Sequence, residues 1–207
     1  MKIFEAWDML AIEGIMRPGD VYVEIGAHRG RFFRESGVVM LNNNGPACHY
    51  HLYEPSTDAR KELEEVADAA RRMMSCCPVH IYPEAIWTHD LGTVYYADRS
   101  EGQGNTLIPG VHINPQRSIV PTVRFKEVVA RAGGHIRFLA MNAEQAEYEI
   151  LRSPAMESVE YATVEFHPGK SGIYTRAFIV EHLSKWEILK FGREGDAYNQ
   201  VVMVNRG

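Results

Sequence analysis

The chain has 207 residues, of which 45% are hydrophobic, so it is long enough for one domain with a substantial core and is not a disordered segment. Its formal net charge is −5 and it has no run of Lys or Arg, which argues against a nucleic-acid partner bound through a basic surface. No apolar run approaches the roughly 20 residues that span a bilayer, so we expect no membrane partner.

The first 19 residues are predicted to form a helical extension. Apolar residues at positions 4, 7, 10, 11 and 15 follow helical spacing, and the sequence Arg17-Pro-Gly19 ends that pattern.

Strands and helices then alternate along the chain. Short apolar runs predict strands at 21–25, 49–53, 79–82, 94–97, 136–141, 159–166, 186–191 and 201–204. Amphipathic segments predict helices at 30–41, from Thr57 onward, and at 122–132, 144–151 and 174–183.

This alternation favours an α/β fold with a mostly parallel sheet covered by helices on both faces, in one domain over residues 1–207. The last two strands are joined by residues 192–196, which leave no room for a crossover helix, so they are predicted to form an antiparallel hairpin. Residues 98–118 have no sustained period and are rich in Gly and Pro. Long segments of this kind inside a domain are usually functional or disordered, and we predict an active-site lid or substrate loop.

A glycine turn follows the first strand of the predicted sheet, in the sequence Glu24-Ile-Gly-Ala-His-Arg-Gly30. Gly26 allows a sharp turn and a close ligand, and Gly30 is expected where the next helix packs, with the helix amides pointing at the ligand. The spacing differs from the G-x-G-x-x-G fingerprint of pyrophosphate binders. A ligand with a carboxylate and an ammonium group fits better, and Glu24 favours the cation. An ordinary strand–helix turn is the structural alternative.

A second acid, Glu54, ends the second strand and precedes Pro55. An acid at this place can accept hydrogen bonds from two ribose hydroxyls, although a solvated loop acid is the alternative. The end of the third strand, around Ala85 and Ile86, should lie beside the base of a nucleoside, where Ile86 or Trp87 could pack. A core role for Trp87 is equally compatible with the sequence.

Polar residues also follow the fourth and fifth strands. Asn142 and Glu144 follow the fourth strand, and Glu165 and His167 end the fifth. Because histidine titrates near neutral pH, His167 is a candidate base, with a surface histidine as the alternative. His28 lies inside the glycine turn, and we predict that it lines the ligand.

Together these motifs resemble the FkbM-type family of S-adenosylmethionine-dependent methyltransferases, among the class I Rossmann-like methyltransferases. The resemblance runs from about Arg17 to His167. VYVEIGAHRGRFF is similar to the family's first motif and LYEPS to its ribose-binding acid motif. FLAMNAEQAEYEIL and YATVEFHP are similar to its K-I-D-x-E-G-x-E and E-x-H blocks. This chain has Ala140 where the family has Lys and Asn142 where the family has Asp.

The resemblance implies a three-layer sandwich with a seven-stranded sheet in the order 3-2-1-4-5-7-6 and an antiparallel C-terminal strand. It implies S-adenosylmethionine as the cofactor. No metal site is predicted, because Asn is a poorer ligand than Asp for a divalent ion. The predicted cofactor-binding residues are Glu24, Gly26, Ala27, His28, Gly30, Glu54, Pro55, Ala85, Ile86, Asn105 and Asn142. The predicted catalytic residues are Asn142, Glu144 and His167.

The predicted reaction is O-methylation of a hydroxyl on a sugar or small natural product. A methyltransferase fold that has become a weak enzyme or a binding module is a second interpretation, favoured by Ala140 and Asn142. An NAD-dependent Rossmann oxidoreductase is a third, disfavoured by the missing glycine cradle. We expect a cytoplasmic protein, because three cysteines and an acidic, charged N-terminal stretch are typical of a reducing compartment without a signal peptide. The oligomeric state is open, and a homodimer is compatible with the sequence.

Overall fold

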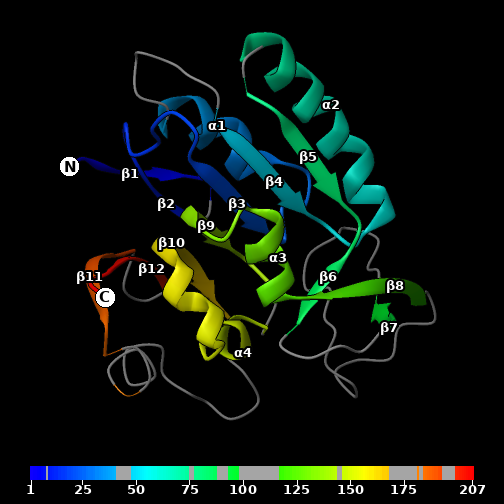
Figure 1. The fold of residues 1–207 in the computed structure, drawn as a ribbon. Coiled ribbons are helices and arrows are strands. Elements are labelled where there is room, and N and C mark those ends of the chain that lie inside the picture. The colour runs from blue at the N-terminus through cyan, green and yellow to red at the C-terminus, as the bar shows by residue number, and fades with distance from the viewer. Residues whose placement is uncertain are drawn as a thin grey trace.

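The computed structural model describes residues 1–7, 9–40, 48–74, 77–87, 93–97, 117–143, 146–167, 181, 184–192 and 199–207. Within these ranges the central sheet has seven strands in the order β11-β12-β10-β9-β3-β4-β5 (Figure 1). Numbered in chain order, they run 3-2-1-4-5-7-6. The strands are β3 (Val21–Ile25), β4 (His49–Tyr53), β5 (Val79–Tyr82), β9 (Ile136–Met141), β10 (Val159–Phe166), β11 (Trp186–Phe191) and β12 (Asn199–Asn205).

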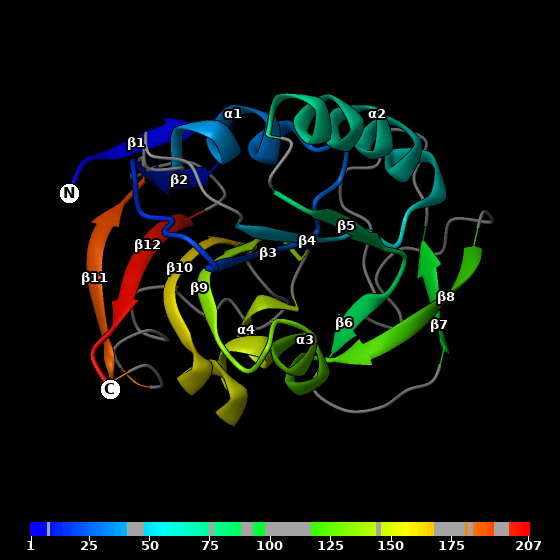
Figure 2. The same cartoon turned by 45° about the horizontal axis from the view of Figure 1, so that its top comes forward.

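Most neighbours in this sheet are parallel, and β12 is antiparallel to both β10 and β11. Helices α1 (Arg31–Met40) and α2 (Thr57–Met73) cover one face. Helices α3 (Phe125–Arg131) and α4 (Glu147–Leu151), with the short 3₁₀ helix Pro154–Ser158, cover the other (Figure 2). The predicted α/β fold class is therefore confirmed. None of the helices in the described ranges is long and apolar enough to cross a bilayer.

The N-terminal extension contains a hairpin, and the helix predicted there was wrong. Strands β1 (Ile3–Ala6) and β2 (Met9–Ile12) pair antiparallel. All four residues of β2 are buried, and the strand contacts both α1 and the strands β10 and β12. An amphipathic helix would bury only one face of this stretch, so burial on two sides favours the strand.

A second, smaller sheet lies beside β5, in the order β6-β8-β7. It contains β6 (Ala85–Trp87), β7 (Thr93–Ala97) and β8 (Arg117–Arg124). The helix predicted from residue 122 begins only at Phe125, because residues up to Arg124 pair with β6 and β7 as part of β8 and Pro121 disfavours a helix interior. The helix predicted over 144–151 likewise begins only at Glu147.

Two long predicted segments are largely outside the described residues. Of the predicted lid at 98–118, only residues 117 and 118 are described, and they belong to β8 rather than to an irregular segment. Of the helix predicted over 174–183, only residue 181 is described.

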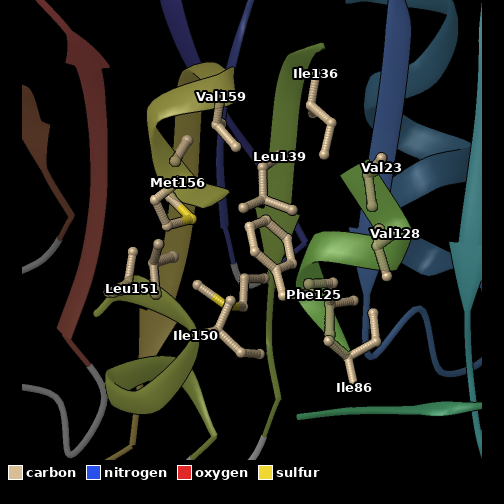
Figure 3. Close-up of a cluster of buried hydrophobic side chains, with 14 of the residues drawn as sticks. Val23, Ile86, Phe125, Val128, Ile136, Leu139, Ile150, Leu151, Met156 and Val159 are labelled. Carbon is tan, nitrogen blue, oxygen red and sulfur yellow. The ribbon is translucent and has the colours of Figure 1, made fainter. Parts of the chain in front are cut away.

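Each face of the central sheet carries its own hydrophobic core. Val23 and Ile25 of β3 belong to the core under α3 and α4, where Val23 lies near Leu139 and Val128 (Figure 3). Tyr22 belongs to the core under α1, α2 and the hairpin. Because successive strand residues point to opposite faces, Glu24 shares the face of Tyr22.

Candidate functional site

The glycine turn brings together the carboxyl ends of β3, β4 and β9. The amides of Gly26 and Ala27 donate to the Tyr53 carbonyl at 2.9 and 3.0 Å, and the Asn142 amide donates to the Ile25 carbonyl at 2.9 Å. Gly26 has φ 75°, and a Cβ added there would lie 1.9 Å from the Asn142 carbonyl oxygen. Only glycine fits at this position, so the three strand ends meet around it.

Gly30 has a different function in the turn. It has φ 73°, and an added Cβ would lie 2.8 Å from Cδ1 of Leu63 in α2. The close packing predicted at this glycine is therefore present, but its partner is helix α2. The next residue, Arg31, begins α1, so the position of the turn is fixed from both helices.

Glu54 is buried at the end of β4 and is held by two backbone amides. Its Oε2 accepts from the His28 amide at 2.8 Å and its Oε1 accepts from the Ser56 amide at 2.7 Å. These two contacts orient the Glu54 carboxylate at the end of the strand. The neighbouring Pro55 uses its carbonyl to accept from Arg60 at 2.6 Å.

His28 has the left-handed backbone conformation within the turn, with φ 47°. Its Nε2 is buried and has no hydrogen-bond partner among the described residues. Burial lowers the pKa of the imidazole, and the nearby Arg29 and Arg31 lower it further. A neutral ring with an unsatisfied nitrogen at the glycine turn suits a residue that lines a polar ligand.

Glu24 is only 1% exposed and accepts a hydrogen bond from the Tyr22 hydroxyl. Burial raises its pKa to about 8, a rise that the Tyr22 hydroxyl opposes and the charge of Glu54 reinforces. The carboxyl is therefore protonated at neutral pH in this structure. The predicted preference for a cation holds only if the cation displaces this proton.

At the end of the third strand, Ala85 and Ile86 are both buried in β6. Ile86 lies in the core near Phe125 and Val128, so its side chain has a structural function, and its contact with a base stays a prediction (Figure 3). Glu84 is held by Arg131 of α3 at 2.8 Å.

The fourth and fifth strands end in two polar pairs. The Asn142 side-chain amide donates to Glu165 across β9 and β10. Beside it, Glu147 Oε1 accepts from the Ala143 amide at 2.8 Å and lies 2.9 Å from His167 Nδ1. Glu147 is completely buried, and His167 is 6% exposed. Asn142 therefore contacts the glycine turn, and His167 is joined to the end of β9 through Glu147 and Ala143, while the catalytic functions of both stay predictions.

Two predicted site residues, Asn105 and Glu144, are outside the described residues. Two acids that were not among the predicted site residues, Glu147 and Glu165, are part of the rim. Both stand in the sequence blocks that follow the fourth and fifth strands, which is the signal that could have identified them. Within the described ranges, no group of three or more His, Cys, Asp or Glu side chains could hold a metal ion.

A family model matches most of this chain. The model of the methyltransferase FkbM domain matches residues 24–187. A solved FkbM methyltransferase from Methylobacillus flagellatus KT is similar, with a TM-score of 0.55 and 12% identity over 91% of this chain. This chain spans only 44% of that protein's length. No curated protein matches the sequence.

Two further solved structures share the fold. A ribosomal protein L11 methylase from Lactobacillus delbrueckii subsp. bulgaricus has a TM-score of 0.50 and 8% identity, with 94% of this chain and 76% of that chain covered. A possible exported protein from Bordetella parapertussis has a TM-score of 0.51 and 8% identity, with 93% and 63% covered. At such low identities these likenesses concern the fold alone.

Proposed function

The chain belongs to the FkbM methyltransferase domain family, and from this membership we propose that it transfers a methyl group from S-adenosylmethionine to a hydroxyl of a sugar or small natural product. The donor supplies an electrophilic methyl group on a sulfonium. The protein then has to bind the donor, align the acceptor hydroxyl and take up its proton. The family supports methyl transfer, whereas the donor and the acceptor class are proposals.

The observation that carries the proposal is the fixed Glu54 beside the glycine turn. The His28 and Ser56 amides orient its buried carboxylate at the end of β4, where an acid can accept hydrogen bonds from the two hydroxyls of a ribose. Gly26 has no side chain, which allows the Asn142 carbonyl to approach closely where β3, β4 and β9 meet. The orphaned Nε2 of His28 lies in the same turn and would gain a partner from a polar ligand. These residues fit an amino-acid-bearing nucleoside.

The residues at the ends of β9 and β10 would act on the acceptor. His167 is held by Glu147 and would accept the proton of the acceptor hydroxyl. Asn142 is held by Glu165 through its amide nitrogen, so its carbonyl oxygen would orient the hydroxyl. An uncharged, hydroxyl-rich acceptor fits the net charge of −5 and the absence of a run of basic residues.

Calorimetric titration with S-adenosylhomocysteine tests the donor half. We expect binding by the unsubstituted protein and on the order of a hundredfold weaker binding by Glu54→Ala, because two hydrogen bonds to a charged acceptor are lost. Glu65→Ala is the matched control, since Glu65 is an exposed acid on α2. Full affinity in Glu54→Ala would remove the ribose assignment.

Transfer of a labelled methyl group from S-adenosylmethionine to a panel of oligosaccharides and polyketides tests the reaction. We expect label in a hydroxyl-bearing product and much less of it with His167→Ala. Binding without transfer to any member of the panel would favour a binding module over an enzyme. Binding of NAD in place of S-adenosylhomocysteine would reject the proposed donor.

A further inference from the structure

A buried carboxyl contacts the candidate base at the rim of the sheet. Glu147 begins α4 and is completely buried, and its Oε1 lies 2.9 Å from Nδ1 of His167 at the end of β10. Resting on the proposed function, we propose that Glu147 is the positioning residue of the reaction. It holds the imidazole of His167 with its proton on Nδ1, so that Nε2 takes the proton of the acceptor hydroxyl.

The charge of Glu147 decides which nitrogen of His167 carries the proton. Glu147 Oε1 also accepts from the Ala143 amide at 2.8 Å. When Glu147 is ionised, Oε1 can only accept, so Nδ1 of His167 is the donor in this contact. A neutral imidazole carries one proton, which leaves Nε2 as the basic nitrogen. In the Ser-His-Asp triad, a carboxylate likewise accepts from Nδ1 of the histidine while Nε2 takes up the proton.

Burial makes this contact strong. The carboxyl of Glu147 is fully buried and the His167 side chain is nearly so, which increases the attraction between a carboxylate and an imidazolium. Glu165, two residues before His167 in the chain, accepts from the side chain of Asn142. Glu147 directly contacts the imidazole and would stabilise its protonated form.

The same residue links the base to the glycine turn. Ala143, whose amide binds Glu147, follows Asn142, whose carbonyl oxygen packs against Gly26. Asn142 and Ala143, which follow β9, therefore contact both the glycine turn and Glu147. A shift of Glu147 would move His167 relative to the turn, which makes Glu147 a positioning residue for the geometry of transfer.

The test is the ¹⁵N NMR spectrum of His167 in histidine-labelled protein, assigned by comparison with His167→Asn. In the unsubstituted protein we expect a neutral ring with the proton on Nδ1. Glu147→Gln keeps a carbonyl oxygen at the position of Oε1, so we expect the same tautomer but protonation at a pH lower by about one unit, because the charge is gone. Glu147→Ala removes the acceptor, and we expect both tautomers.

Glu149→Gln is the matched control, because Glu149 lies on the same helix, is half-exposed and pairs with Arg152 at 3.1 Å. It should leave the His167 spectrum and titration unchanged. A proton on Nε2 in the unsubstituted protein overturns the proposal without any variant. So does an unchanged titration in both Glu147→Gln and Glu147→Ala.

Kinetics then separates this proposal from the proposed function. Once the panel has identified a methyl acceptor, Glu147→Ala should lower kcat about 10- to 100-fold and leave the KM for S-adenosylmethionine nearly unchanged. Glu147→Gln should move the acidic limb of the pH–rate profile to lower pH. Failure to bind S-adenosylhomocysteine or to transfer methyl groups would reject the proposed function, while the NMR result would still decide the Glu147 contact.

Discussion

Replacing Glu24 with Gln is expected to change how the stability of the protein depends on pH. In the folded state, burial raises the pKa of Glu24 from its ordinary value of 4.5 to about 8. Between these values the folded chain holds a proton that the unfolded chain has released. The free energy of unfolding therefore decreases as the pH rises through this window and levels off above it.

The size of this effect follows from the same two values. The displacement from 4.5 to about 8, at about 1.4 kcal/mol for each tenfold change in proton affinity, gives about 5 kcal/mol. This figure is an upper bound, since structural relaxation around an ionised Glu24 would reduce it. Gln resembles the protonated carboxyl in shape, can accept from Tyr22 and does not ionise, so the variant should lose this dependence.

Urea unfolding at about pH 5 and about pH 9 measures the prediction. We expect similar stabilities for Glu24→Gln and the unsubstituted protein at the lower pH and a more stable variant at the higher pH. Glu62→Gln, a half-exposed acid on α2, is the control and should show no growing difference. Tyr22→Phe should have the opposite effect to Glu24→Gln, because the Tyr22 hydroxyl stabilises the carboxylate. Parallel stability curves for Glu24→Gln and the unsubstituted protein would refute the buried, protonated Glu24.

Three other substitutions, one of them with a matched control, test the glycine turn, the sheet and the contact between Asn142 and Glu165. Gly26→Ala places a Cβ 1.9 Å from the Asn142 carbonyl oxygen and should cost more than about 3 kcal/mol in thermal unfolding, whereas Gly14→Ala, with φ 64° and no atom within 4 Å, should cost only about 1 kcal/mol. Burial lowers the pKa of His51 from 6.5 to about 4, so stability should rise with pH through this interval, by at most about 3 kcal/mol, and His51→Asn should lose that rise in urea titrations. Asn142→Asp replaces a donor to Glu165 with a second carboxyl and should lower the free energy of unfolding by on the order of 2 kcal/mol at neutral pH, with recovery in acid; equal stability at neutral pH would contradict the Asn142–Glu165 contact.

Strand positions were the most predictable part of the fold. The bounds of β4, β5, β9 and β10 agree with the prediction, because each is a short apolar run set off by polar or turn residues. The helix predicted at the N-terminus was wrong because apolar residues in the first 16 positions fit helical spacing as well as they fit a hairpin whose second strand is buried on both faces. Only the contacts of β2 with α1, β10 and β12 distinguish the two, and they come from tertiary structure.

Some residues of the candidate site could be predicted from local sequence motifs, whereas the contact between Glu147 and His167 could not. Gly26, His28 and Glu54 could be identified because their motifs are local and each follows a recognisable strand. The contact between Glu147 and His167 joins residues on a helix and a strand that are 20 positions apart. Their approach depends on the parallel register of β9 and β10, in which Met141 lies opposite Val164. That register is absent from the one-dimensional pattern of apolar residues.

The strand order of the central sheet also determines when folding can be completed. β12 inserts between β10 and β11, so β10 keeps an unpaired edge until residues 199–205 are available to the chain. Pairing between distant parts of a sequence is slow, and an open strand edge is a template for aggregation. During synthesis the parallel strands from β3 to β10 can therefore assemble first. β12 then pairs with β10 and covers the strand edge of β10 that could otherwise pair with a second chain.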